Sequence, residues 1–400
     1  MDAGIVIVGA GHAGDAVAAQ LRQFGHAGPI TLLGAERHRP YHRPPLSKTW
    51  LKGEGTEDTL ALRPADFHAR QAIDFRPGCS VTAIDRAGRR VHLASGEALA
   101  YATLILATGA RPRALALPGA EMPHVHALRT RDDAERLRTA LGPDRNLVLV
   151  GGGYIGLEIA ASARALGTRV RVLERENRLL PRVASAELAG FFQSRHAAEG
   201  VDIRLGARPV EITRHGIRLA DGALLAADAV LVGIGAVANI ELAEASGLAC
   251  DGGIVVDADA RTADGAIFAI GDCTSRPVDG RRMRLESVPS ALEQARRAAA
   301  AITGRPPPAA EVPWFWSDQY DIRLQIAGLL PPAPETVRRG DPASGRFALF
   351  HLRPDGTLAA VEAVNSPDAF AAGRAFIARH TLLAREKLAD PSVPMTQAAA

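Results

Sequence analysis

Cysteine and lysine are scarce in this 400-residue sequence, and aromatic residues make up only 4% of it. The three cysteines, Cys79, Cys250 and Cys273, lie far apart and form no Cys-x-x-Cys pair. This spacing argues against a disulfide framework, a zinc site and a redox dithiol. The twelve histidines show no metal-ligand spacing, so we predict no metal site.

Long apolar runs and an excess of charge are also missing. The longest uncharged apolar runs, such as 229–240, span about a dozen residues, which is too short for a transmembrane helix. The first residues lack the basic start and plain apolar run of a signal peptide. The net charge is only +3, and the basic residues form no concentrated stripe that would bind nucleic acid. We therefore expect a cytoplasmic protein that binds neither nucleic acid nor a membrane.

Short buried-strand patterns alternate with helical patterns, and one such unit occurs twice. An apolar run at 5–8 leads into glycines, a helical pattern follows, and a second strand is predicted at 30–33. The same arrangement returns with strands at 147–150 and 170–173. Further buried strands are predicted at 104–107, 229–232 and 267–270. Alternating strands and helices predict parallel sheets covered by helices.

The first repeat contains a dinucleotide-binding fingerprint. Gly9, Gly11 and Gly14 form a Gly-x-Gly-x-x-Gly loop that follows a strand and opens a helix. In such a loop the first glycine permits the turn, the second lets a pyrophosphate approach the backbone, and the third permits close helix packing. Glu36 lies 22 residues after Gly14, near the distance at which a carboxylate binds ribose hydroxyls.

The second repeat contains an independent fingerprint, formed by Gly151, Gly153 and Gly156. Glu174 follows 18 residues after Gly156, at the end of the next strand. A carboxylate there favours NAD over NADP, whereas Arg175 and Arg178 are nearby cations that could bind a 2′-phosphate. One dinucleotide site is enough for a simple dehydrogenase, so two sites predict FAD together with NAD(P)H.

The character of the chain changes after a predicted linker at 305–308, which reads Arg-Pro-Pro-Pro. Strand patterns follow at 322–330, 347–352 and 357–364, then a helix at 370–379 and a frayed tail at 394–400. The predicted fold is therefore α/β, with two Rossmann-like domains and a small C-terminal α+β domain. We assign 1–112 and 242–308 to an FAD-binding domain, 113–241 to an NAD-binding domain, and 309–400 to the C-terminal domain.

Several further motifs identify a family. The sequence resembles the two-dinucleotide flavoprotein superfamily of the glutathione-reductase type, and within it the NADH-dependent ferredoxin reductases of oxygenase systems. The resemblance covers essentially the whole chain. Segments 104–112 and 262–272 are similar to general motifs of the superfamily, whereas segments 43–48, 286–295 and 313–320 are similar to motifs of the ferredoxin-reductase branch.

The resemblance implies additional cofactor contacts. Beside the fingerprint residues, the implied FAD contacts are Ala13, Ala35, Arg43, Lys48, Val81, Ala107, Thr108, Gly109, Arg111, Gly271, Asp272 and Val288. The implied NADH contacts are Gly151, Gly153, Ile155, Glu158, Glu174, Arg182 and Gly235.

Four residues are candidates for catalysis, each with a plainer alternative. Lys48 is either a surface lysine or a group near the flavin N5, and Glu158 is either a solvated carboxylate or the ion-pair partner of Lys48. Tyr154 either packs at a domain interface or covers the flavin until nicotinamide displaces it. Trp316 is either a core residue or lies at the flavin edge.

The missing cysteines indicate where electrons go. Disulfide reductases of this superfamily carry a cysteine pair on the first FAD-domain helix, and other relatives carry one cysteine in the segment matching 41–50. This sequence has neither. Electrons must therefore leave the flavin for an external acceptor.

The predicted function is hydride transfer from NADH to FAD, followed by single-electron transfer to a [2Fe–2S] ferredoxin that serves a cytochrome P450 or a ring-hydroxylating dioxygenase. Alternatives are a reductase of rubredoxin or of a small-molecule acceptor, and a redox-sensing flavoprotein that acts by binding partners. We expect a monomer or a weak homodimer.

Overall fold

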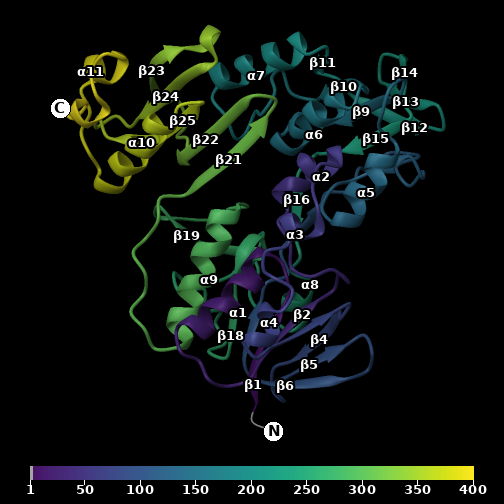
Figure 1. The fold of residues 1–400 in the computed structure, drawn as a ribbon, viewed down its shortest axis with the longest axis vertical. Coiled ribbons are helices and arrows are strands. Elements are labelled where there is room, and N and C mark those ends of the chain that lie inside the picture. The colour runs from purple at the N-terminus through teal and green to yellow at the C-terminus, as the bar shows by residue number, and fades with distance from the viewer. Residues whose placement is uncertain (1–2) are drawn as a thin grey trace. The chain divides into compact units, whose positions relative to one another are not determined.

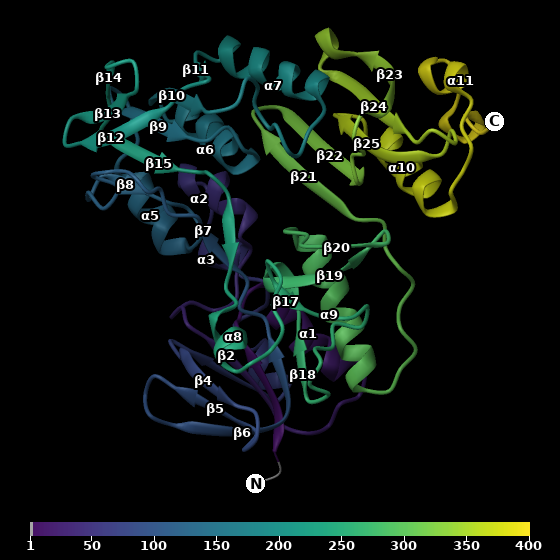
Figure 2. The same cartoon turned by 180° about the vertical axis from the view of Figure 1, so that it is seen from behind.

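The computed structural model describes residues 3–400, which divide into two compact units (Figures 1 and 2). The first unit contains the residues up to His42, Thr56–Arg111 and Ala236–Ala310. The second contains Arg43–Gly55, Pro112–Gly235 and Glu311–Ala400. No helix among residues 3–400 is long and apolar enough to span a bilayer.

The first unit is built on a seven-stranded sheet in the order β3-β2-β1-β6-β5-β4, with β18 paired to β6. Its strands are β1 (Gly4–Val8), β2 (Ile30–Gly34), β3 (Ile73–Pro77), β4 (Val81–Asp85), β5 (Arg90–Leu93), β6 (Ala98–Leu106) and β18 (Ile267–Ala269). Strands β1, β2, β3 and β18 join the end of β6 in a parallel arrangement, whereas β4, β5 and the start of β6 are antiparallel.

Two helices, α1 (His12–Gln23) and α9 (Val288–Ile302), pack side by side in the first unit. Small residues on both helices, among them Ala18 and Ala295, are buried in one hydrophobic cluster with Val17 and Leu21. The remaining elements of this unit are short: α3 (Glu57–Leu60), α4 (Phe67–Arg70), α8 (Glu241–Ala245), η2 (Gly271–Cys273), β7 (Ala110–Pro112), β16 (Ala236–Ala238), β17 (Ile254–Val255), β19 (Thr274–Val278) and β20 (Arg281–Met283).

The second unit contains a parallel sheet in the order β11-β10-β9-β15-β8. Its strands are β8 (Val125–His126), β9 (Asn146–Val150), β10 (Arg169–Glu174), β11 (Asp202–Leu205) and β15 (Ala229–Val232). The accompanying elements are η1 (Pro44–Ser47), α2 (Thr49–Lys52), α5 (Arg131–Thr139), α6 (Tyr154–Ala165), α7 (Ala186–Ala198) and an antiparallel sheet of β12 (Pro209–Thr213), β13 (Gly216–Leu219) and β14 (Leu224–Ala226).

The C-terminal part of the second unit is an antiparallel sheet in the order β21-β22-β25-β24-β23. Its elements are β21 (Trp314–Gln319), β22 (Ile322–Gly328), β23 (Glu335–Asp341), η3 (Pro342–Ser344), β24 (Arg346–Leu352), β25 (Leu358–Val364), α10 (Pro367–Arg379), α11 (Arg385–Ala389) and η4 (Met395–Gln397). Alternating residues face opposite sides of this sheet. Phe347 and Leu349 join the cluster that contains Phe192 of α7, whereas Ala348 and Phe350 join Phe370 of α10. The sheet is therefore buried on both faces.

The predicted fold class is confirmed, and the repeated strand–loop–helix–strand unit forms as β1–α1–β2 and β9–α6–β10. The predicted frayed tail is wrong. Ala398 is fully buried, its carbonyl accepts from the Ala384 N–H, and the Ala400 N–H donates to the Leu382 carbonyl. The sequence pattern of the tail is too short to show this contact, because its partners lie in the neighbouring segment.

One buried carboxylate fastens the C-terminal sheet to the start of α7 within the second unit. Glu362 on β25 accepts from the N–H of Ser185 at 2.8 Å and from its hydroxyl at 2.5 Å. His351 Nε2 lies 3.1 Å from the same carboxylate, and both side chains are fully buried. Ser185 is the N-cap of α7, so this cluster fixes the point where the helix begins.

We expect Glu362→Leu to lower the free energy of unfolding by about 3 kcal/mol or more, because it leaves buried donors without an acceptor. Glu187→Gln, which breaks the exposed pair with Arg338, should cost less than about 1 kcal/mol. Urea unfolding of the two variants measures both values. Equal losses would contradict the role of the buried cluster.

Candidate dinucleotide-binding sites and active site

Two glycines of the first glycine loop, Gly9 and Gly14, lie so close to neighbouring backbone that a side chain has no room. Gly9 has a φ of +110°, and a Cβ added there would lie 2.1 Å from the Ala107 carbonyl oxygen. A Cβ on Gly14 would lie 1.8 Å from the Gly9 carbonyl oxygen. No side chain fits at either place, so the turn from β1 into α1 requires both glycines.

The second glycine loop repeats this arrangement. Gly151 has a φ of +106°, and its added Cβ would lie 2.5 Å from the Gly233 carbonyl oxygen. A Cβ on Gly156 would lie 3.0 Å from the Gly151 carbonyl oxygen. The two loops are therefore built on the same close contacts, although they belong to different units.

The middle glycine of each loop is different. Among residues 3–400, a Cβ added to Gly11 or Gly153 would meet no atom within 4 Å other than those of its own chain neighbours. Both residues are helix N-caps without a side-chain cap, so the first N–H groups of α1 and α6 are not covered by a capping side chain. The space and the donors at each loop fit a pyrophosphate that approaches the backbone. The residues of both loops are thus compatible with bound dinucleotides.

Other predicted FAD contacts gather around the first loop. A Cβ on Gly271 would lie 3.0 Å from the Cβ of Ala13, so the second FAD motif touches the fingerprint helix. The Gly271 N–H and the Thr274 hydroxyl both donate to Gln294 Oε1. Gln294 of α9 is buried and therefore fixes the turn that carries Asp272.

The predicted segment 107–111 is held by Asn239, which the sequence did not identify as a site residue. The Thr108 hydroxyl donates to the Asn239 carbonyl at 2.6 Å, and Asn239 Nδ2 donates to the Thr108 carbonyl at 2.8 Å. Arg111 donates to Asn239 Oδ1 and pairs with Glu241 at 2.6 Å. Asn239 lies four residues after the predicted contact Gly235, but no local pattern shows that it contacts Thr108 and Arg111.

Strand register shows that Glu36 and Glu174 are not structural counterparts. Leu33 on β2 pairs with the residue before Gly9, as Leu173 on β10 pairs with the residue before Gly151. Glu174 therefore matches Gly34, and Glu36 matches the residue two positions after Glu174. Glu36 lies beyond the strand end, where its carboxylate accepts a hydrogen bond from the Tyr41 hydroxyl. The predicted strands, 30–33 and 170–173, already place Glu174 directly after its strand and Glu36 three residues after its own, and the register shows the same difference.

Glu174 lies directly against the second loop. The Gly152 N–H donates to its Oε2 at 2.7 Å, and the Glu176 N–H donates to its Oε1 at 2.9 Å. Arg175 pairs with Glu176, and Arg178 donates to the carbonyls of nearby loop residues. A buried carboxylate thus lies at the loop, whereas both neighbouring cations have partners.

Three further predicted NADH contacts lie around this loop. Ile155, in the first turn of α6, is exposed although it is a large apolar residue. Arg182 is exposed, and its guanidinium lies 3.6 Å from the position of a Cβ on Gly235. The structure therefore brings Arg182 and Gly235 together from distant parts of the sequence.

Tyr154 is half-buried and packs within the second unit. Its ring lies 4.8 Å from that of Phe315, and its hydroxyl donates to the Val183 carbonyl at 3.4 Å. Burial raises the pKa of Tyr154 well above its ordinary value, so the hydroxyl stays protonated. Trp316 stacks on Trp314 with 5.5 Å between the ring centroids. Their predicted places beside the flavin remain predictions.

Lys48 and Glu158 form an ion pair, with 2.6 Å between Nζ and Oε2. Lys48 follows η1, and Glu158 is buried on α6. Ser47 donates to Oε2 of the same carboxylate at 2.5 Å, and Ser317 donates to Oε1 at 2.7 Å. The predicted partners are therefore in contact, and the two serines are participants that the sequence did not single out.

The remaining predicted contacts are distributed as follows. Arg43 donates to the Arg129 carbonyl, and Val81 begins β4, where it pairs with Leu93. Val288 begins α9, whose N-cap is Ser287. Ala35 is exposed just after β2. The geometry gives their positions, and their cofactor contacts remain predictions.

The described cysteines are free thiols. Cys273 is fully buried, and burial raises the pKa of its thiol. Burial also raises the pKa of the Cys250 thiol. A raised pKa disfavours the thiolate, which is the reactive form.

Two loops of the same geometry, each with an open middle glycine, define a protein that binds two dinucleotides. A sequence profile described as pyridine nucleotide-disulphide oxidoreductase matches residues 3–295, and one described as reductase C-terminal matches residues 314–399. The chain belongs to the pyridine nucleotide-disulphide oxidoreductase family. Members of this family use FAD and NAD(H), so the predicted cofactors and enzyme class are confirmed.

Full-length relatives support the predicted resemblance to ferredoxin reductases. The chain is 49% identical to a probable ferredoxin reductase of Castellaniella defragrans over 98% of both chains. It is 43% identical to the ferredoxin–NAD(+) reductase component of an anthranilate 1,2-dioxygenase system of Burkholderia cepacia, over 97% of both chains. The putidaredoxin reductase in a covalent complex with putidaredoxin is 40% identical, with a TM-score of 0.96 over 99% of this chain and 98% of that one. The predicted resemblance is confirmed.

We expect Gly11→Ala to fold normally but to lose FAD, because its methyl group would occupy the open space at the loop. Gly153→Ala should keep FAD and raise the KM for NADH. Each change should cost less than about 1 kcal/mol of stability. Gly14→Ala should instead destabilise the protein by about 1–3 kcal/mol, because its methyl group meets a backbone oxygen.

Thermal unfolding and the flavin absorbance of the purified variants separate these effects. A Gly11→Ala protein that retains full FAD would contradict the assignment of the first loop.

Proposed function

We propose that this protein transfers electrons from NADH through FAD to a [2Fe–2S] ferredoxin of an oxygenase system. The observation that carries the proposal is the pair of open glycine loops in a chain without a Cys-x-x-Cys pair. FAD accepts a hydride and releases electrons one at a time, so it links a two-electron donor to a one-electron acceptor. Ferredoxin is proposed as the acceptor because the similar proteins are named as ferredoxin reductases.

The proposal assigns the two loops to different cofactors. Residues of the first unit around Gly11 hold FAD, and residues of the second unit around Gly153 and Glu174 hold NADH. We keep the division into an FAD-binding domain (1–112 and 242–308), an NAD-binding domain (113–241) and a C-terminal domain (309–400). Lys48 and Glu158 remain the proposed catalytic pair, with Lys48 near the flavin N5. A cytoplasmic location, where NADH is produced, is part of the same proposal.

Glu174 supports NADH as the donor. A 2′-phosphate at the end of β10 would meet a buried carboxylate, whereas ribose hydroxyls could donate to it. Arg175 is paired with Glu176, and Arg178 is bound to backbone carbonyls, so neither cation is directed to a phosphate by these contacts.

Glu174→Arg should reduce the preference for NADH over NADPH by about 1–3 kcal/mol, the usual scale for hydrogen bonds to charged groups. The ratio of kcat/KM values for the two donors measures this change. Glu187→Gln, which removes an exposed carboxylate of α7, should leave the ratio unchanged. A wild-type protein that uses both donors equally would contradict the assignment.

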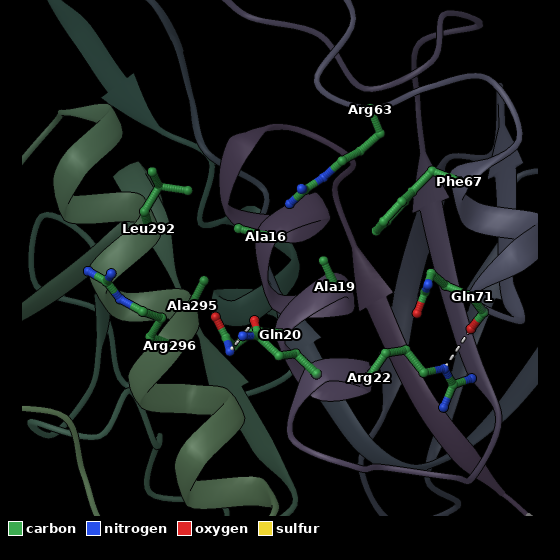
Figure 3. A pocket seen from close by; sticks show the side chains of 11 residues that line it. Ala16, Ala19, Gln20, Arg22, Arg63, Phe67, Gln71, Leu292, Ala295 and Arg296 are labelled. Atoms are coloured by element: carbon green, nitrogen blue, oxygen red, sulfur yellow. Dashed lines mark hydrogen bonds between the residues drawn. The ribbon is translucent and has the colours of Figure 1, made fainter.

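A basic hollow in the first unit supports an acidic protein partner. Arg22, Arg63 and Arg296 line a surface hollow of about 410 Å³ between α1, α9 and the segment around Phe67 (Figure 3). None of the residues that line it is acidic, although Arg63 pairs with the buried Asp15 of α1 at 2.9 Å. Arg22 donates to backbone carbonyls, such as that of Gln71, so no carboxylate neutralises it through these bonds. Ferredoxins of this type are generally acidic.

We expect Arg296→Glu to slow ferredoxin reduction by about tenfold at low salt and to weaken its dependence on ionic strength. At about 0.15 M salt, screening acts over roughly 8 Å. The difference in the rate of ferredoxin reduction between the wild type and Arg296→Glu should therefore shrink as salt rises. NADH–ferricyanide turnover, which needs no ferredoxin, should stay the same. Arg90→Glu on β5 makes the same charge change outside the hollow and is the control.

Stopped-flow measurement of the two half-reactions decides between the candidate acceptors. If the variant slows flavin reduction by NADH as much as ferredoxin reduction, the hollow is not a docking surface. If no ferredoxin accepts electrons and rubredoxin or a small quinone does, the acceptor in the proposal is wrong.

A further inference from the structure

Strand β21 places polar side chains on the face of the C-terminal sheet that meets α6 and α7. Successive strand residues face opposite sides, so Phe315, Ser317 and Gln319 share one face. Phe315 contacts Tyr154, and Ser317 contacts Glu158, both on α6. Ser317 is fully buried and Gln319 nearly so. Buried polar groups on a strand need partners, and these partners form one continuous chain.

The chain runs from the surface to the Lys48–Glu158 pair. Tyr320 OH lies 3.0 Å from His196 Nδ1, and His196 Nε2 lies 2.8 Å from Gln319 Oε1. Gln319 Nε2 donates to Ser317 Oγ at 3.0 Å. Ser317 Oγ then donates to Glu158 Oε1 at 2.7 Å.

The direction of every hydrogen bond in the chain follows from Gln319. Its Oε1 can only accept, so His196 Nε2 carries a proton. Burial lowers the pKa of His196, and a neutral ring with a proton on Nε2 must accept at Nδ1. Tyr320 therefore donates to His196. Each group therefore donates its hydrogen bond in the direction of Glu158, and the last acceptor in the series is the Glu158 carboxylate.

Glu158 consequently receives hydrogen bonds on both oxygens. Ser47 and Lys48 donate to Oε2, and Ser317 donates to Oε1. Donors on both oxygens of a buried carboxylate fix its orientation. Because linked hydrogen bonds polarise one another, Gln319 and His196 strengthen the donation by Ser317.

We propose that Ser317 is a positioning residue, which, backed by Gln319, His196 and Tyr320, holds the Glu158 carboxylate against Lys48. The C-terminal segment then contributes to the active site from behind α6. This inference rests on the proposed function only where it assigns a catalytic role to the Lys48–Glu158 pair.

Lysine labelling tests the inference without any cofactor reaction. The sequence has three lysines, Lys48, Lys52 and Lys387, so trace acetylation of the FAD-loaded protein with acetic anhydride gives three rates by mass spectrometry. In Ser317→Ala, Oε1 loses this donor and the carboxylate turns more easily away from Lys48. We expect Lys48 to be acetylated about tenfold faster, the lower end of the range for a lost hydrogen bond to a charged group. The rates of Lys52 and Lys387 should not change.

Matched variants separate positioning from general loosening. Ser317→Thr keeps the hydroxyl and should return the Lys48 rate to within about twofold of wild type. Ser275→Ala changes a buried serine of β19 that is not part of this series of hydrogen bonds, and it should leave the acetylation rate of Lys48 unchanged. In Ser317→Ala the first-order rate of flavin reduction at saturating NADH should fall. The KM for NADH should stay unchanged.

An unchanged Lys48 rate in folded Ser317→Ala would overturn the inference, as would equal acceleration in Ser275→Ala. If Ser317→Ala does not fold, Tyr320→Phe decides, because it removes one hydroxyl at the far end. A faster Lys48 rate in that variant supports the chain, and no change overturns it. The labelling result is independent of the electron acceptor, so failure of the ferredoxin proposal leaves it intact.

Discussion

The structure depends on a close contact that no side chain can enter. At Gly9 and Gly14, and again at Gly151 and Gly156, the backbone turns from a strand into a helix so tightly that an added Cβ would lie within 3.0 Å of a carbonyl oxygen. This contact presses the helix onto its parallel sheet and directs its first N–H groups to the end of the strand. The middle glycine then borders open space, where a phosphate can reach those donors. The same short loop thus allows the tight turn from strand to helix and leaves space for a phosphate at the helix N-terminus.

Buried carboxylates perform the second task, which is to fasten parts of the second unit to one another. Glu174 holds the second glycine loop through the Gly152 N–H, and Glu362 holds the start of α7 through Ser185. Glu158 holds Lys48 and accepts from serines on two different segments. Each charge is buried, and each is matched by several donors, which offsets much of the cost of removing it from water. The same donors leave the carboxylates little freedom to move.

The C-terminal sheet is more than a cover for the second unit. One face belongs to the hydrophobic cluster shared with α7, and the same face sends Ser317 to Glu158 and Glu362 to Ser185. These contacts explain why residues 311–400 cluster with the residues around the second loop. Segments that the sequence separates with a proline-rich linker are joined by buried polar groups.

The sequence by itself determined the two glycine loops, the strands and helices on either side of them, and the two cofactors. These features are local, because the spacing of glycines and apolar residues is enough to specify a strand, a turn and a helix. The Lys48–Glu158 pair was predicted from a family resemblance. Only the tertiary structure decided that Asn239 and Gln294 support the FAD motifs, that Ser317 contacts Glu158, and that the tail is ordered. Each of these depends on strand register or on contacts between residues far apart in the chain. One residue of register changes which face a side chain occupies, and no local pattern records it.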